Sequence, residues 1–513
     1  MTTSGETTGQ KLHPEDRHFI IVGAGPVGLL AAILLVQEID ALQVTIYESR
    51  DGLITDLQES YPVGVNPRGA RALDRARPDM AIALRKRGVM VDAWKIYAGR
   101  RMIAEVPSGL VVGTTRSMIN EMLYEEVRKH FRGRIEIKWG HRLKSLDLLE
   151  RRLVFDVKQP ATDPDLARTY EEVTVEGGGA RMLACDGVWS EVRAFAENHV
   201  EGFKSQITPW GVQFRLLFSK PGAGALAPYL KPENHYVMSG IYVSIIEGNV
   251  WVMGLGIDDG LPAQTRDLLL ATESTPTRVA ALRAYVTKKA PLAAPFLTEE
   301  DLSMYFKRRS FRGAMVKVNR LNLGEWGVLL GDAAHCVIPP IGEGFNSGAE
   351  DVEVLMDAMH HDLDHPFSKY NEWRLPDLHA LHELAFDVNQ SNFGNLGPEK
   401  ISRLITSMMV GLAKSCGVFR TTWEDMSFGA DAFPPKSYLE IGSVWRWQRL
   451  FLLPLARIIV WPMYLLVWVV MRPVQLMWTV MTGPNRGGGG GGGEGGGGER
   501  GRGGDGTQKS KRA

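Results

Sequence analysis

The sequence predicts an α/β protein: a doubly wound, Rossmann-like nucleotide-binding domain with an inserted mixed β-sheet, then C-terminal helices and a membrane segment. Three observations predict this fold. A short apolar run, 19–22, leads through a glycine-rich turn into a helical pattern, as in a βαβ unit. Residues 241–255 have the pattern of a β-hairpin, with 247–249 as its turn. Residues 450–483 are the most apolar part of the chain.

The composition fits a globular protein of two or three domains. The chain has 513 residues, 44% hydrophobic and 23% charged, which excludes a wholly disordered, collagen-like or small disulfide-rich protein. Basic and acidic residues both number 59, so the formal net charge is zero and gives no indication of nucleic-acid binding. Cys185, Cys336 and Cys416 form no CxxC pair. We therefore expect no disulfide framework and no metal site, and a reducing compartment is favoured.

Both ends of the chain are predicted to be disordered. Residues 1–16 lack the apolar core of a secretory signal and contain acidic residues that a transit peptide avoids. Between 487 and 506, 15 of 20 residues are glycine, so 483–513 should form a flexible tail. Gly/Arg tails that bind RNA exist, but no aromatic residue interleaves this one.

The segment 446–482 is predicted to associate with a lipid membrane. A spanning helix needs about 20 mostly apolar residues. The stretch 450–471 meets that length with Arg457 as its one charge. Prolines at 454, 462 and 473 keep a kinked, re-entrant or interfacial helix open. A buried helix of a soluble domain also remains open.

The first glycine turn, 23–28, predicts a dinucleotide site. Gly23 forms the tight turn, Gly25 leaves the backbone open to a pyrophosphate, and Gly28 allows close packing of helix and strand. Pro26 and Val27 complete the turn, and the helix N-terminus attracts phosphates. Glu48 lies 20 residues beyond Gly28 and can accept a hydrogen bond from a ribose 2′-OH. FAD or NAD is therefore favoured over NADP here.

Two later segments resemble the FAD-dependent aromatic-ring monooxygenases that have one dinucleotide fold. One runs from Gly331-Asp332 through Pro339 to the second glycine turn, 342–346, and the other is the Asp186-Gly187 segment. The resemblance implies that Asp332 binds the ribityl chain, that 342–346 lies at the flavin ring, and that Asp186 and Arg116 lie near the phosphates and ribityl. From the residues alone, a helix N-cap at Asp332 and a plain turn at 186–187 stay open.

Several stretches are similar to the kynurenine 3-monooxygenase family. They are 342–351 (GEGFNSGAED), Phe367 to Asp377, 184–193 (ACDG with Ser190 and Arg193), and Arg68-Gly69 with Ala72 and Leu73. The predicted FAD contacts are then Gly23, Gly25, Pro26, Val27, Gly28, Glu48, Arg68, Arg116, Asp186, Gly187, Gly331, Asp332, Pro339, Gly342, Gly344, Phe345 and Asn346. The family also has an apolar C-terminal membrane segment.

The substrate region departs from that family. Trp94 stands where the family has an arginine that holds the substrate's carboxylate, although Lys95 or Arg100 could compensate. The predicted substrate residues are Trp94, Tyr97 and Asn389. Glu343 replaces a glutamine, and Pro62 replaces an asparagine near the flavin. We expect a larger or more apolar ring compound in place of kynurenine.

The predicted activity is that of a monooxygenase with tightly bound FAD. It would use NAD(P)H, bound transiently because no second GxGxxG exists, and O2 to hydroxylate an aromatic or other electron-rich small molecule. No catalytic side chain is required. Glu343 and His335 are candidates for proton transfer. Alternatively, either residue has a structural role, or Glu343 faces solvent. A membrane flavin epoxidase, a prenyl reductase and a non-catalytic flavoprotein scaffold also remain open.

The predicted domain boundaries follow these motifs. The FAD-binding domain comprises 17–75, 107–195 and 315–360, and the substrate domain comprises 76–106 and 196–314. A helical region, 361–445, precedes the membrane segment. The protein should face the cytosol or lie on an organelle, and the resemblance implies the mitochondrial outer membrane. The oligomeric state stays open.

Overall fold

The computed structural model describes residues 17–56, 60–159, 169–226, 229–392, 397–427 and 432–482. The segments predicted to be disordered, 1–16 and 483–513, lie outside the described residues. A compact unit extends to Arg457, and the chain from Ile458 belongs to a second unit.

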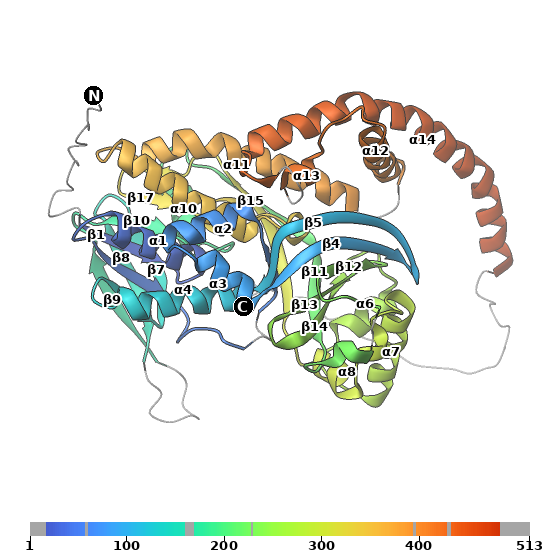
Figure 1. Ribbon diagram of the computed structural model, residues 1–513, viewed down its shortest axis with the longest axis horizontal. Coiled ribbons are helices and arrows are strands. Elements are labelled where there is room, and N and C mark those ends of the chain that lie inside the picture. The colour runs from blue at the N-terminus through green and yellow to red at the C-terminus, as the bar shows by residue number, and fades with distance from the viewer. Residues whose placement is uncertain are drawn as a thin grey trace, which may run out of the picture. The chain divides into compact units, whose positions relative to one another are not determined.

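A six-stranded sheet contains the predicted βαβ unit (Figure 1). Its order is β16-β17-β10-β1-β2-β6, and every neighbouring pair is parallel except β16 with β17. The strands are β1 His18–Val22, β2 Gln43–Glu48, β6 Ile135–Trp139, β10 Arg181–Ala184, β16 Asn322–Leu323 and β17 Gly327–Leu329. Parallel strands are covered on both faces, which explains the continuous apolar runs. The predicted doubly wound fold is confirmed.

Helices cover this sheet and share its core. They are α1 Pro26–Glu38, α2 Pro67–Ala76, α3 Met80–Arg87, α4 Arg116–His130, α5 Glu191–His199, α9 Asp332–His335 and α10 Gly344–His361. Helix α1 is apolar on every side and buries residues from Pro26 to Val36, because it lies between the sheet and neighbouring helices.

The second sheet has eight strands in the order β15-β11-β14-β13-β12-β4-β5-β3. The strands are β3 Pro62–Val65, β4 Val89–Ala98, β5 Arg101–Thr115, β11 Ser205–Phe218, β12 Asn234–Met238, β13 Ile241–Ile246, β14 Val250–Ile257 and β15 Ser310–Val318. The predicted hairpin is confirmed: β13 and β14 pair antiparallel around Glu247–Asn249. One face of the sheet packs on α6 Ala263–Leu270, α7 Pro276–Lys289 and α8 Glu299–Tyr305 (Figure 1).

The eight-stranded sheet crosses the predicted domain boundaries. Strand β5 runs without interruption through the boundary at 106, and β3 lies inside the range expected for the FAD-binding domain. The backbone N–H and C=O groups of β3 need partners, and they find them on β5, across the predicted boundary. The division into two functional domains stays a prediction.

A small sheet and the C-terminal helices complete the chain. Strands β7 His141–Asp147, β8 Arg152–Lys158 and β9 Tyr170–Glu176 form the three-stranded sheet. The C-terminal helices are α11 Pro366–Asn392, α12 Pro398–Ser415, α13 Trp423–Ser427 and α14 Tyr438–Thr482. Within α14, Tyr438–Pro473 is long and apolar enough to cross a membrane, and an 18-residue window in it has a mean hydropathy of 2.0.

Candidate functional site

The first glycine turn adopts a backbone that side chains would disrupt. Gly23 has a φ of 104°, and its N–H donates to the Tyr47 carbonyl at 2.8 Å. A Cβ on Gly28 would lie 2.1 Å from the Gly23 carbonyl oxygen. A Cβ on Gly25 would meet only the Arg116 guanidinium, at 3.7 Å. The turn thus presents open backbone at Gly25, where the sequence predicts a phosphate.

Glu48 holds this turn from the end of β2. Its Oε2 accepts the Ala24 N–H at 2.7 Å, and its Oε1 accepts the Arg50 Nε at 2.8 Å. Burial alone would raise the pKa of Glu48, but Arg50 and the backbone N–H groups hold it below the ordinary value. Glu48 therefore stays ionised at the predicted ribose position. Arg50 is a site residue that the sequence analysis missed, although it lies two positions away.

Two half-buried acids, Asp332 and Asp186, lie near the first turn. Burial raises the pKa of Asp332, opposed by the charges of Arg116 and His335. Burial also raises the pKa of Asp186, whose Oδ2 accepts the Val192 N–H at 3.2 Å. Among the described residues, the buried Oδ1 of Asp186 has no hydrogen-bond partner. Such an oxygen is costly unless a ligand's donor completes it.

The first glycine turn meets Gly331 and helix α10 at Val27. A Cβ on Gly331 would lie 3.1 Å from a Val27 methyl, and one on Gly348 would lie 2.7 Å from it. Gly331, Gly342 and Gly187 have φ values of 58°, 72° and 83°. The structure thus brings Val27 together with residues that lie about 300 positions later in the sequence.

The second glycine turn is fixed by side chains. Pro339 starts the short helix that precedes Gly342. Asn346 donates to the carbonyls of Gly342 at 2.8 Å and Gly64 at 2.9 Å, and it accepts the Asn66 N–H at 3.0 Å. Phe345 packs against Gly69. A Cβ on Gly344 would meet no described atom within 4 Å, so backbone is open at this turn also.

Glu343 is buried and belongs to a cluster of ionised side chains. Its carboxylate accepts the Asn66 amide at 2.9 Å and the Tyr438 hydroxyl at 2.8 Å. Burial raises the pKa of Glu343 to about 7, with the charge of Arg68 opposing it. The alternative of a solvent-facing Glu343 is wrong, because only 2% of the residue is exposed.

Arg68 and His335 lie in the same cluster, which we call the buried ion cluster. It consists of Arg68, His335, Glu343, Glu350, Asp351, Arg374 and Asp377. Arg68 ion-pairs with Glu350 and donates to the Lys436 carbonyl at 2.6 Å. The cofactor contact predicted for Arg68 stays a prediction. Arg374 pairs with Glu350, Asp351 and Asp377, and the Nε2 of His335 lies 2.5 Å from Asp351. His335 thus has a structural partner.

The predicted substrate residues do not converge. Trp94 stacks on His235 at 6.1 Å between ring centroids, whereas Tyr97 contacts Tyr236. Because consecutive residues of a strand point to opposite faces, Trp94 and Tyr97 lie on opposite faces of the sheet. Asn389 accepts the Trp210 indole N–H at 3.0 Å, far along the sheet order from β4.

An aromatic cluster was missed by the sequence analysis. The Phe214 and Phe311 rings stack at 5.2 Å, and Tyr61 meets both edge-on. The backbone carbonyl of Tyr61 accepts the Arg116 backbone N–H at 3.1 Å, which places the cluster beside Arg116. Its members come from three distant segments, so no local pattern marks them.

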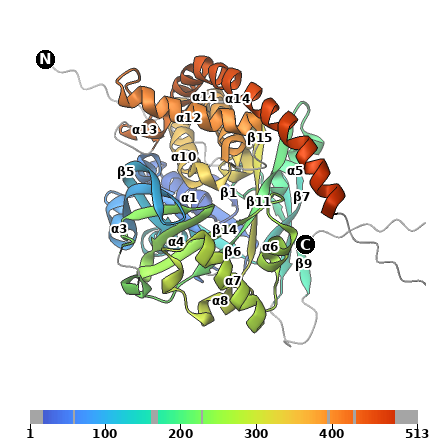
Figure 2. The same ribbon diagram turned by 90° about the vertical axis from the view of Figure 1, so that its right-hand side faces the viewer.

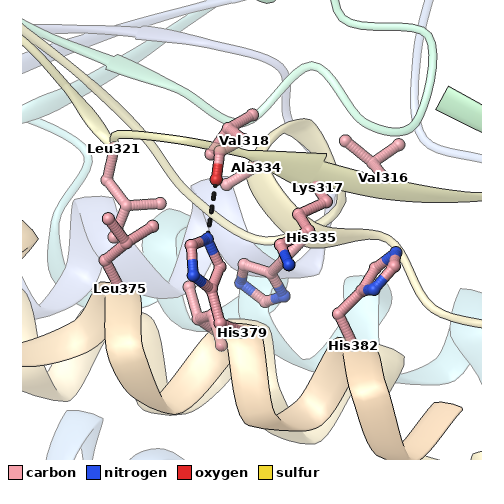
Figure 3. Close-up of a pocket in the computed structure, with 10 residues that line it drawn as sticks. Val316, Lys317, Val318, Leu321, Ala334, His335, Leu375, His379 and His382 are labelled. Atoms are coloured by element: carbon pink, nitrogen blue, oxygen red, sulfur yellow. Dashed lines mark hydrogen bonds between the residues drawn. The ribbon is translucent and has the colours of Figure 1, made fainter. Parts of the chain in front are cut away.

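A small cavity lies behind the Asp332 turn (Figure 3). His335, His379 and His382 line it, and the His379 Nε2 donates to the Val318 carbonyl at 2.9 Å. Its volume of about 10 Å³ admits about one water molecule. The cavity is too small for an aromatic substrate. Among the described residues, no group of three or more His, Cys, Asp or Glu could hold a metal.

The chain is similar in sequence to curated kynurenine 3-monooxygenases. That of Candida albicans is 27% identical over 387 residues, covering 72% of this chain and 78% of that protein. Those of Saccharomyces cerevisiae and Anopheles gambiae are each 25% identical, covering 71% and 74% of this chain and 79% and 75% of those proteins. No protein-family model matches the chain.

Solved structures share the fold. The 2-methyl-3-hydroxypyridine-5-carboxylic acid oxygenase superposes with a TM-score of 0.58 at 17% identity, covering 76% of this chain and 96% of that one. The p-nitrophenol 4-monooxygenase of Pseudomonas putida gives a TM-score of 0.56 at 18% identity, covering 86% and 97%. The chain thus shares its fold with these two oxygenases.

Proposed function

We propose that this kynurenine 3-monooxygenase-like chain is a monooxygenase that binds FAD tightly and uses NAD(P)H and O2 to hydroxylate an aromatic or other electron-rich small molecule. The observation that carries the proposal is the packing of the first glycine turn, whose backbone is open at Gly25, against Gly331 and Gly348 through Val27, beside the half-buried acids Asp186 and Asp332. The similarity to kynurenine 3-monooxygenases along more than two thirds of the chain supports it.

The residues present fit FAD. The open backbone at Gly25 next to Arg116 suits a pyrophosphate, and the unpartnered Asp186 Oδ1 suits a hydroxyl donor. Backbone N–H groups at Gly344 and the start of α10 suit the polar edge of a flavin ring. Bound FAD supplies the electron and oxygen transfer chemistry.

Side chains of the protein would hold the glycine turns in place around the FAD and set the charge and water content of its surroundings. Asn346 fixes the second turn through Gly342 and Gly64. One carboxylate oxygen of Glu343 accepts the Tyr438 hydroxyl, and the other accepts the Asn66 amide. Because the pKa of Glu343 lies near neutrality, its carboxyl can exchange a proton at the second turn. The aromatic cluster of Tyr61, Phe214 and Phe311 excludes water beside Arg116.

The proposed substrate lacks an amino-acid carboxylate. Trp94 stacks on the buried His235, and burial lowers the pKa of that histidine to about 4, so His235 adds no positive charge at neutral pH. Lys95 pairs in register with Tyr236 and lies 3.7 Å from Glu105, on the face away from Trp94. Lys95 therefore does not replace the missing carboxylate clamp, and an apolar ring compound fits better.

The experiment is a ligand screen on detergent-purified protein. Apolar aromatic compounds and L-kynurenine are compared for stimulated NAD(P)H consumption, with mass analysis of the products under 18O2. We expect stimulation and one added 18O atom with an apolar ring compound. Micromolar affinity for L-kynurenine alone would overturn the substrate proposal. Product formed without O2 would indicate a reductase, and a colourless protein that takes up no FAD would overturn the function.

Membrane association through α14 is part of the proposal. One helix of this length and hydropathy supports it, and the kynurenine 3-monooxygenase resemblance favours the mitochondrial outer membrane with the compact unit facing the cytosol. Cell fractionation with alkaline carbonate extraction tests it. We expect the protein to remain with an outer-membrane marker after extraction, and release into the supernatant would contradict the proposal.

A further inference from the structure

Helix α12 carries an apolar strip that the described parts of the chain leave uncovered. Leu404, Met408 and Leu412 recur every four residues, so they share one helix face. Their exposed fractions are 41%, 74% and 65%. The other face is buried and contains Thr406 and Val410. A helix that buries one face and exposes large apolar side chains on another needs a second partner.

Helix α12 lies beside the N-terminal part of α14 (Figures 1 and 2). Arg449 donates to the Ser407 hydroxyl at 3.3 Å. Phe419, just after α12, meets the Trp447 ring at 5.6 Å. This part of α14 also exposes apolar side chains. We call the combined surface the α12–α14 face; it consists of Leu404, Met408, Leu412, Trp447, Leu450, Phe451 and Leu455.

Acidic groups beside the α12–α14 face have cationic partners. Glu399 pairs with Arg457 at 2.6 Å, and Asp425 pairs with Lys414 at 2.5 Å. Asp387 is paired with Arg449 at 2.5 Å. Their negative charges are therefore compensated, and anionic lipid headgroups would meet little repulsion here.

We propose that the α12–α14 face lies on a lipid bilayer at headgroup depth, so that the compact unit contacts the membrane itself. Lipid is the occupant because α14 continues without a break from this face into the exposed apolar side chains beyond Arg457, among them Ile458, Trp461 and Leu466. A helix that enters a bilayer brings its preceding turns, and whatever packs beside them, to the membrane surface. This inference rests on the proposed membrane association of α14.

The test measures membrane depth at single labelled positions in the full chain. Cys416 is replaced by serine, and nitroxide labels are attached at Met408→Cys, at Leu466→Cys in the candidate span, and at Leu149→Cys as the aqueous control. Leu149 is 94% exposed on the three-stranded sheet. The protein is reconstituted in phosphatidylcholine–phosphatidylglycerol vesicles, and collision rates with O2 and with a water-soluble nickel chelate are compared.

We expect the O2-to-nickel ratio at position 408 to exceed that at 149 by about threefold and to fall below that at 466. A ratio at 408 equal to that at 149, with a high ratio at 466, would overturn this inference and leave membrane association standing. Low ratios at both positions would overturn both. Protection of 408 from both reagents, increasing with protein density, would assign the face to a second copy of the chain.

Discussion

The two glycine turns of the candidate site are stabilised in different ways. The first turn depends on backbone: Gly23 bonds to Tyr47, and Gly28 packs against the Gly23 carbonyl. The second turn depends on side chains from distant segments, among them Asn66 and Tyr438. A nearby motif is enough to specify the first turn, whereas the second requires the buried ion cluster. The following changes test that difference, from the largest expected effect to the smallest.

Gly28→Val should abolish FAD binding. Its Cβ would lie 2.1 Å from the Gly23 carbonyl oxygen, and neither backbone segment can move without opening the turn. Flavin absorbance of the purified protein measures the effect. Gly52→Ala is the control, because a Cβ there meets no described atom within 4 Å. Normal flavin content in Gly28→Val would show that the first turn does not hold the cofactor.

Arg374→Met should be the most destabilising change near the second turn. It leaves Glu350, Asp351 and Asp377 buried without their shared cation, at a cost of about 3–5 kcal/mol in the free energy of unfolding. Denaturant unfolding measures it. Arg87→Met is the matched control, since the side chains of Arg87 and its partner Glu121 are 39% and 40% exposed and their ion pair should contribute about 1 kcal/mol or less. Equal losses of unfolding free energy in the two variants would refute a special role of the buried ion cluster.

Glu343→Gln should remove a pH dependence. The pKa of Glu343 is raised by burial to about 7 from 4.5. The folded chain therefore keeps a proton that the unfolded chain releases between these values, and the free energy of unfolding falls as pH rises through that window. The amide does not titrate, so between pH 4.5 and pH 7 the difference in the free energy of unfolding should shift by about 3 kcal/mol in favour of the variant.

Unfolding measured from pH 4 to 8, as a difference from wild type, isolates this contribution. Glu125→Gln, whose side chain is 46% exposed on α4, is the control and should leave the pH profile unchanged. If Glu343→Gln and wild type showed the same slope, Glu343 would carry no raised pKa, and its proposed proton exchange would lose its basis.

Tyr438→Phe should have the smallest effect. It removes one hydroxyl that donates to Glu343 at 2.8 Å, which corresponds to about 1 kcal/mol in the free energy of unfolding. In a double-mutant cycle with Glu343→Gln, the coupling should be of similar size. Tyr464→Phe, exposed in the apolar part of α14, should change nothing. Strict additivity of the first two changes would mean that α14 does not stabilise the second turn.

The sequence by itself determined the first turn, the hairpin around Glu247–Asn249 and the apolar C-terminal helix. Each depends on residues close in sequence: a glycine spacing specifies the turn, a period of two specifies the strands, and a long, mostly apolar stretch specifies the helix. The same local logic identified Glu48 but not Arg50, because arginine two residues past a strand carries no distinctive pattern.

Only the tertiary structure decided the environments of Glu343, Arg68 and Trp94. Glu343 is ionisable near neutral pH because folding buries it with Asn66 and Tyr438, residues about 277 and 95 positions away along the chain. Arg68 pairs with Glu350, 282 residues distant, a partner that no local pattern indicates. Strand register puts Trp94 and Tyr97 on opposite faces. Burial and charge pairing depend on which distant segments meet, and a linear pattern does not contain that information.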